Sequence, residues 1–292
     1  MVYLIGRVLS VHSSECRVAL GEDTVSCTFR GRLRLDSSRV YAGDIVSISH
    51  SGGVYVVDGI RDRRNLLVRP PVANVDQAIV VTAITRPPLD LLYIDRILVQ
   101  LESQGIQGVI CINKQDLEDQ DEIDKVRDIY SSAGYQCVVT SAVTGLGLKE
   151  LVGLLEEKVT ILAGQSGAGK SKLISALIGV KLLTGTLSDD ARGRHTTKWV
   201  KLFRASRDGY IADTPGFSKI DLVSVEPHEL GFMYPEIARY ASLCHFPRCI
   251  HKTEDRCEVR KALSQGEISP ERYRNYLVLL DEATERAKFK YE

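Results

Sequence analysis

Two short motifs in the sequence have the residue types and spacing of a nucleotide site. Gly164 to Ser171 reads GQSGAGKS and fits G-x-x-x-x-G-K-[ST], a glycine-rich loop whose backbone N–H groups surround phosphates. Asn113 to Asp116 reads NKQD and fits N-K-x-D, in which the aspartate accepts hydrogen bonds from guanine. Adenine lacks that pair of donors and would leave the carboxylate unpaired. Together the motifs predict a site for a guanine nucleotide.

The expected nucleotide contacts come from three segments, since Thr140-Ser141-Ala142 fits the loop that accompanies the guanine motif. Lys170 is expected on the β- and γ-phosphates, and the Ser171 hydroxyl on Mg²⁺. For either motif alone, a glycine-rich turn or a solvated Asn-Lys turn is the simpler interpretation. The candidate GTP-binding residues are Asn113, Lys114, Gln115, Asp116, Ser141, Ala142, Gly164, Gln165, Ser166, Gly167, Ala168, Gly169, Lys170, Ser171 and Lys172.

A polar segment without periodicity, residues 184–197, has the composition of a switch loop, although a plain surface loop is the alternative. Within it, Thr196 or Thr197 would give a hydroxyl to Mg²⁺. Asp213 to Gly216 reads DTPG and fits the D-x-x-G element, so Asp213 and Gly216 are expected to sense Mg²⁺ and the γ-phosphate. Phe217 and Ser218 follow where many GTPases carry a water-orienting glutamine. His195 is the nearest catalytic candidate, and a merely solvated histidine is the alternative.

A third cluster of chemically active side chains lies near the C-terminus. Cys244, Cys249, His251 and Cys257 are spaced C-x4-C-x-H-x5-C. Three thiolates and one imidazole match a closed tetrahedral Zn²⁺ site, in which no position is left for catalysis. Disulfides are one alternative, and His245 is a competing nitrogen ligand. A short hairpin between Cys249 and His251 favours His251.

The elements that must position these residues alternate between strands and helices from residue 78 to residue 178. Apolar runs at Gly108–Ile112 and Lys158–Ala163 predict buried strands leading into the two motifs, and Lys172–Ile178 predicts the helix after the phosphate loop. Such alternation predicts a parallel sheet covered by helices on both faces. The guanine motif precedes the phosphate loop, which reverses the usual order. The central region is therefore expected to be a circularly permuted α/β P-loop GTPase.

The flanking regions predict two further domains. Five short alternating segments before residue 61 suggest an OB-fold β-barrel, and periodic runs at Glu258–Leu263 and Glu271–Ala287 suggest a small helical domain held by the metal. The barrel region has ten arginines against seven acidic residues. Arg30, Arg32 and Arg34 alternate along one segment, so their side chains could align on one face toward nucleic-acid phosphates; an ordinary solvated strand edge is the alternative. The expected domains are 1–69 (RNA-binding barrel), 70–220 (GTPase) and 221–292 (zinc-binding).

Composition excludes several classes of protein. The whole chain of 292 residues balances 38 basic against 38 acidic residues, which gives nucleic-acid binding no support beyond the local excess. It has neither a signal peptide nor a long apolar segment. Seven cysteines in such a chain favour a reducing, cytoplasmic setting. We expect a monomer without a membrane partner.

The order of barrel, permuted GTPase and Cys₃His region resembles the ribosome small-subunit-dependent GTPase family, RsgA, also called YjeQ. The resemblance covers essentially the whole chain and includes NVDQ (Asn74 to Gln77), GRHTT, DTPGF and GEISPERYRNY (Gly266 to Tyr276). It implies a cytoplasmic factor that binds the small ribosomal subunit and its rRNA late in maturation and hydrolyses GTP in response. The family's zinc ligands and catalytic histidine fall on the residues already named. Lys198 departs from it by replacing a third threonine.

Two classes of function remain open at this point. The first is a GTP-hydrolysing enzyme whose turnover is switched on by the small ribosomal subunit. The second is a nucleotide-gated rRNA-binding module in which hydrolysis is incidental. A generic P-loop ATPase is a weaker third interpretation, because Asp116 would then have no role. Zn²⁺ in the C-terminal region, and Mg²⁺ with GTP or GDP, are the expected cofactors.

Overall fold

The computed structural model describes residues 4–31, 39–68, 71–183, 200–206, 208–213 and 225–289. The chain divides into two compact units. The first contains residues 1–77, 148–162 and 171–217, and the second contains residues 78–147, 163–170 and 218–292. Both units are therefore assembled from segments far apart in the sequence. Among the described helices, none combines the length and the hydropathy needed to cross a bilayer.

The N-terminal strands form the closed, OB-like barrel predicted from the sequence. Alternating residues point inward, so Val8, Cys16, Val46 and Ile48 are completely buried. Pairing of the first strand with both the second and the fourth closes the sheet and removes its edges. The strands are β1 (Leu4–Val11), β2 (Glu15–Leu20), β3 (Asp23–Phe29), β4 (Ile45–Ser51) and β5 (Val54–Ile60).

The rest of the first unit adds a short hairpin and part of an α/β layer. Strand β13 pairs in parallel with β11 and antiparallel with β12, and β12 meets β1 at Lys201 and Ser10. Of the predicted arginine row, Arg30 is described, and it pairs with Asp58 at 2.9 Å. Arg32 and Arg34 lie outside the described residues. The elements are β6 (Leu66–Val68), β7 (Pro71–Ala73), α4 (Leu148–Gly153), β11 (Val159–Ala163), α5 (Lys170–Leu183), β12 (Lys201–Ser206) and β13 (Gly209–Asp213).

The NVDQ segment has a structural role within the first unit. Asn74 adopts a left-handed conformation with φ 56°, and its side-chain amide donates to the Gly43 carbonyl at 3.1 Å. The Asp76 carboxylate accepts from the Val159 N–H at 2.8 Å. The buried Gln77 amide donates to the Leu154 carbonyl at 2.6 Å. The Asp76 bond holds the start of β11, which leads into the phosphate loop.

The second unit contains a parallel sheet with helices, as predicted for a GTPase core. Strand β9 lies between β8 and β10, and β8 is buried along its whole length, as expected for a strand covered on both faces. Asp90 caps α2 by accepting from the Tyr93 N–H, and Asp119 caps α3. The elements are β8 (Gln77–Thr82), α2 (Leu91–Glu102), β9 (Gln107–Ile112), η1 (Gln115–Leu117), α3 (Gln120–Ala133) and β10 (Gln136–Val139).

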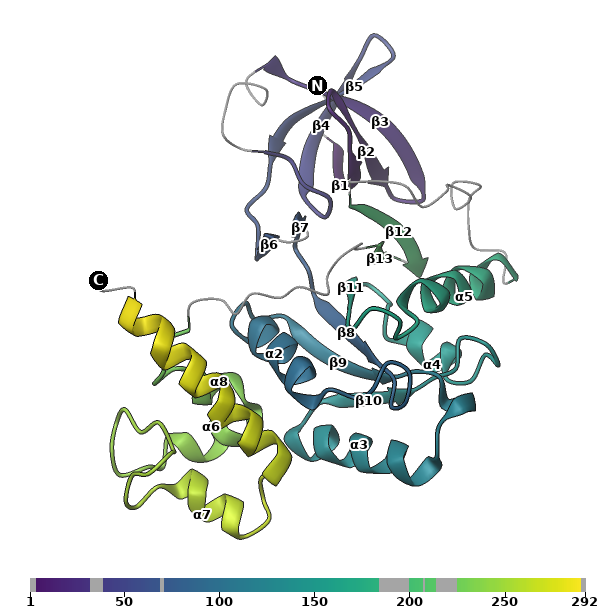
Figure 1. Ribbon diagram of the computed structural model, residues 1–292. Coiled ribbons are helices and arrows are strands. Elements are labelled where there is room, and N and C mark those ends of the chain that lie inside the picture. Colours follow the sequence, from purple (N-terminus) through teal and green to yellow (C-terminus); the bar gives the residue numbers. More distant parts are fainter. Residues whose placement is uncertain are drawn as a thin grey trace. The chain divides into compact units, whose positions relative to one another are not determined.

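The C-terminal segment of the second unit is helical, as predicted, and shares a hydrophobic cluster with α2. Val99 of α2 belongs to the same buried cluster as Tyr234, Ile237 and Tyr276. Helix α8 packs against α2, and Figure 1 shows α6 and α7 beside α8. The elements are η3 (Leu230–Met233), α6 (Pro235–Ala241), α7 (Glu258–Ser264) and α8 (Pro270–Phe289).

A buried arginine fastens the C-terminal helices to α2, which belongs to the parallel-sheet part of the second unit. Arg272 of α8 is 1% exposed and makes a bidentate bond to Glu236 of α6 at 2.6 and 3.0 Å. It also donates to Asp95 of α2, whose second oxygen accepts from Asn275 at 2.8 Å. The Tyr234 ring lies 4.7 Å from the guanidinium carbon. One cation therefore ties three helices together away from water.

Candidate functional site

The phosphate loop follows β11 directly and leads into α5, the strand–loop–helix order that the motif requires. Two of its glycines have no room for a side chain. Gly164 has φ 130°, and a Cβ there would lie 2.0 Å from the Val81 carbonyl oxygen. Gly169 has φ 100°, and a Cβ there would lie 2.4 Å from the Asn113 amide nitrogen. The glycines thus let the loop pass close to β8 and to the guanine motif.

The loop lysine is held by the loop itself. The Lys170 ammonium donates to the carbonyl oxygens of Gly164 and Gln165 at 2.6 and 2.8 Å. Partial burial lowers the pKa of Lys170, because desolvation disfavours the charged amine. A phosphate at this loop would offset that cost with opposite charge. The arrangement is therefore suited to binding a polyanion.

Asn113 connects the guanine motif with the other two nucleotide segments. Its side chain is buried and donates to the Ala168 carbonyl in the phosphate loop at 2.9 Å. Its oxygen accepts from the Thr140 hydroxyl at 3.1 Å and from the Ala142 N–H at 3.3 Å. One amide thus bonds to partners on two other loops. The three sequence motifs are brought together by this residue.

The carboxylate of the predicted guanine motif is oriented by the Ser-Ala loop. Ser141, which is buried, donates its hydroxyl to Asp116 at 2.5 Å and accepts from the Thr144 N–H at 3.1 Å. Asp116 itself is exposed, so a base can reach it. A fixed, accessible carboxylate has the chemistry needed to accept two N–H donors from one edge of guanine.

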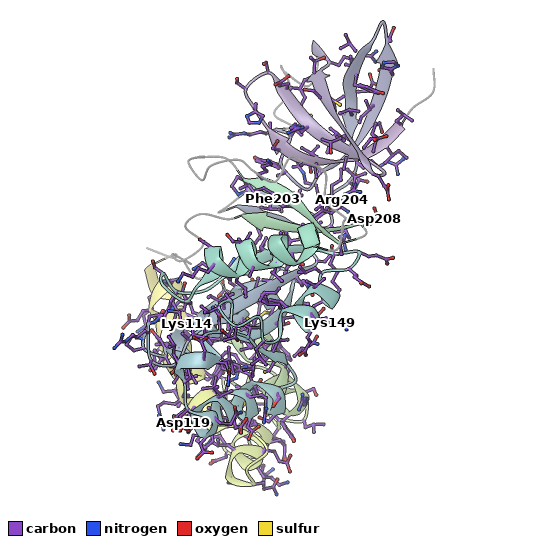
Figure 2. All side chains as sticks on the ribbon, turned by 90° about the vertical axis from the view of Figure 1, so that its right-hand side faces the viewer. Lys114, Asp119, Lys149, Phe203, Arg204 and Asp208 are labelled. Carbon is purple, nitrogen blue, oxygen red and sulfur yellow. The ribbon has the colours of Figure 1, made fainter. Side chains whose placement is uncertain are left out.

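Lys114 is positioned by an unusual backbone conformation. It has φ 69° and ψ 34°, the left-handed region, and is the N-cap residue of the short helix η1. Its ammonium donates to the Arg86 carbonyl at 2.5 Å, in the loop between β8 and α2. Figure 2 labels Lys114, and also Asp119 at the start of α3. The Lys114 side chain is thereby held against the loop that joins β8 and α2.

The remaining predicted nucleotide residues divide into two groups. Ser171 and Lys172 lie in the first turn of α5 and are exposed, and Asp213 is the last residue of β13. The other predicted switch residues lie outside the described residues: His195, Thr196, Thr197 and Gly216. Their roles stay predictions.

The structure also brings the four predicted metal ligands together. Their ligand atoms all lie within 4.8 Å of one another. The sulfurs of Cys244 and Cys257 are 3.9 Å apart, and each lies 3.5 Å from Nδ1 of His251. A tetrahedral centre with Zn–S of about 2.3 Å and Zn–N of about 2.0 Å separates its ligands by about 3.6–3.8 Å. The Cys₃His cluster therefore fits such a centre.

The two alternatives for this cluster are not favoured. A sulfur separation of 3.9 Å is far longer than a disulfide bond, and the seven cysteines are free thiols. His245 packs its ring against Phe246 and is not in the cluster. Burial raises the pKa of the Cys249 thiol to about 12, so its deprotonation needs a nearby cation.

The hairpin that carries His251 is held by groups that sequence reasoning did not identify. Hydroxyls of Tyr273 and Tyr276 on α8 donate to the carbonyls of His251 and Ile250 at 2.6 and 2.7 Å. The Glu254 carboxylate accepts the backbone N–H groups of Ile250, Lys252 and Thr253. The spacing of the tyrosines on one helical stripe was the available signal.

Comparison with known proteins gives a family for this architecture. The family model described as RsgA GTPase matches residues 60–223. A small ribosomal subunit biogenesis GTPase RsgA from Caldanaerobacter subterraneus is 38% identical over 291 residues, covering 98% of each chain. The protein of that name from Thermotoga neapolitana is 40% identical over 291 residues, covering 97% of this chain and 98% of its own.

Solved structures agree with these relatives. The crystal structure of YjeQ from Thermotoga maritima superposes with a TM-score of 0.84 at 35% identity, covering 97% of this chain and 99% of that one. The structure of YloQ, described as a circularly permuted GTPase, gives 0.83 at 32% identity, covering 98% and 96%. With a family model that matches more than half of its residues and relatives about 40% identical over nearly its whole length, the chain belongs to the RsgA GTPase family.

Proposed function

We propose that this chain is a guanine-specific GTPase of small ribosomal subunit biogenesis, which binds the subunit and its rRNA in the cytoplasm late in maturation. The observation that carries the nucleotide assignment is Asp116, held by Ser141 beside Asn113, which itself bonds to the phosphate loop. Family membership supports the reaction, in which GTP and water give GDP and phosphate. The names of its relatives support the small subunit as partner.

The chain's own residues would share the work as follows. Asp116 selects guanine, Lys114 flanks the base, and the phosphate loop with Lys170 takes the phosphates. Mg²⁺ would be held by the Ser171 hydroxyl with Thr196 or Thr197, near Asp213 and Gly216, and would neutralise phosphate charge. His195 is proposed to orient water, since Phe217 stands in place of the usual glutamine. The absence of that glutamine also supports the second candidate, a nucleotide-gated rRNA-binding module that hydrolyses little GTP.

Competition for labelled GDP tests the nucleotide assignment. GTP should displace labelled GDP at equal concentration, whereas ATP should not, because adenine offers Asp116 no matching donor pair. Displacement by ATP as effective as displacement by GTP would refute the assignment.

We also propose a division into three domains with junctions at residues 69/70 and 220/221. Limited proteolysis should cut at those junctions if the division is right.

We further propose that the Cys₃His cluster holds one structural Zn²⁺ per chain. Elemental analysis of protein purified without added metal should then give about one zinc per chain. Cys249→Ser should lose that zinc and loosen residues 244–257 in hydrogen exchange, because metal binding contributes to folding. GDP binding should remain. His245→Ala is the matched control and should keep its zinc, since His245 is not in the cluster. Folded protein with metal content near zero would contradict the proposal.

A further inference from the structure

The loop between β8 and α2 is held by a single carboxylate. Glu118 accepts the backbone N–H of Ile84 at 3.1 Å and that of Thr85 at 2.9 Å through one oxygen. Its other oxygen accepts the Thr85 hydroxyl. Three donors from two consecutive residues therefore converge on one side chain from another part of the unit. The Glu118 side chain is well localised, because both of its oxygens have hydrogen-bond partners in the loop.

The same loop bonds to the guanine motif and lies near the phosphate loop. The Arg86 carbonyl accepts the Lys114 ammonium at 2.5 Å. On the other side, a Cβ at Gly167 of the phosphate loop would lie 3.8 Å from Cδ of Pro87, an ordinary van der Waals distance. Residues 84–87 thus contact the guanine motif at Lys114 and lie near the phosphate loop at Gly167. Displacement of this loop would remove the only acceptor that the structure gives Lys114 among the described residues.

A hydrogen-bonded turn connects Lys114 and Glu118, the two residues that hold this loop. The Leu117 N–H donates to the Lys114 carbonyl at 2.9 Å, and the Glu118 N–H donates to the Gln115 carbonyl at 3.2 Å. Glu118 therefore holds the loop at Ile84 and Thr85, while Lys114 of the same turn holds it at Arg86. The loop is therefore held at two points. Any displacement of the loop away from the turn would break the bonds to Glu118 and the bond to Lys114 together.

We propose that Glu118 is a positioning residue for guanine nucleotide: it fixes the loop at residues 84–87, which in turn holds Lys114 against the base. The inference rests on the proposed function and adds a residue beyond the N-K-x-D motif. Without the carboxylate, the N–H groups of Ile84 and Thr85 turn to water and Lys114 loses its fixed acceptor. The nucleotide then leaves faster, while the fold remains.

Two conservative variants separate reach from charge. Glu118→Asp keeps the charge but is one methylene shorter, and should raise the GDP dissociation rate constant about tenfold, the factor expected for a lost bond to a charged group. Glu118→Gln keeps an acceptor for both N–H groups and a donor for the Thr85 hydroxyl, and should stay within about threefold of wild type. The reverse order would show that charge rather than position matters, and would overturn the proposal.

Glu122→Asp is the matched control, because Glu122 is an exposed glutamate that pairs with Lys125 on α3. It should dissociate GDP like wild type. A Glu118→Asp rate equal to that of the control would sink the inference while leaving the proposed function intact. Failure of the wild-type protein to bind GDP would instead sink the proposed function.

A double-mutant cycle tests the route through Lys114. If Glu118 acts by holding that lysine, Glu118→Asp should add less than about twofold to the dissociation rate in a Lys114→Met background. A full tenfold effect in that background would show that Glu118 does not act through Lys114. The midpoint temperature of thermal unfolding of each variant should stay close to that of wild type. A lower midpoint would mean that the variant releases GDP faster because its fold is destabilised.

Discussion

Replacing Asp116 with asparagine is expected to lower the affinity for GDP by about 10²- to 10⁴-fold. The carboxylate would accept two N–H donors of guanine, and each hydrogen bond to a charged group contributes about 1.5–3 kcal/mol. Asparagine presents one donor and one acceptor instead, a pattern that matches xanthine. The variant should therefore prefer xanthosine diphosphate. Equilibrium titration with labelled GDP and labelled xanthosine diphosphate measures both effects.

Asp119→Asn is the matched control for this change. Asp119 lies three residues further on, at the N-cap of α3, where it accepts from the Asp121 N–H. Asparagine is an equally good N-cap, so the fold should tolerate it. Unchanged GDP affinity in both variants would mean that Asp116 does not read the base.

Replacing Arg272 with methionine is expected to destabilise the second unit by about 3–5 kcal/mol, the usual cost of breaking one side of a buried ion pair. The methionine would leave the carboxylates of Asp95 and Glu236 buried without their cation; both residues are at most 2% exposed. Amide protection in α2 and α8 should fall by about 10²- to 10³-fold in hydrogen exchange. Exchange is the suitable measurement, because it reports these helices separately in a chain with several domains.

Lys125→Met provides the control, since it breaks an exposed pair with Glu122 and should cost less than about 1 kcal/mol. Combining Arg272→Met with Asp95→Asn and Glu236→Gln should recover part of the protection, because no uncompensated charge is left buried. Protection in the single variant equal to that of wild type would show that the pair does not fasten α8 to α2 and α6.

The sequence predicted those parts of the molecule that depend on neighbouring residues. The phosphate loop and the guanine motif are each a continuous run of residues. The roles of the glycines in the first and of the aspartate in the second are set within those runs. The barrel strands and the strands around the motifs followed from alternating and continuous apolar runs, which the burial patterns of β1 and β8 bear out. The zinc-type cluster followed from four ligands within 14 residues.

Residues that act through distant partners could not be predicted in this way. Arg272 lies on the buried stripe of α8 with Tyr276, but charged side chains are usually exposed, and nothing local identifies Asp95 as its partner 177 residues away. Glu118 stands in a run of acidic residues that indicates a solvated turn. Its partners Ile84 and Thr85 are set by the sheet, where β8 and β9 lie side by side.

Multiple-turnover phosphate release from GTP, with and without purified small ribosomal subunits, tests whether this protein is a GTPase that the subunit stimulates. We expect slow release by the protein alone and an acceleration of about tenfold or more with subunits, a modest demand beside the 10³- to 10⁵-fold effects of arginine fingers. ATP should give no accelerated release. His195→Ala should remove most of the acceleration and leave GDP affinity nearly unchanged. Subunits that bind without accelerating release would contradict the enzyme account and favour the nucleotide-gated rRNA-binding module.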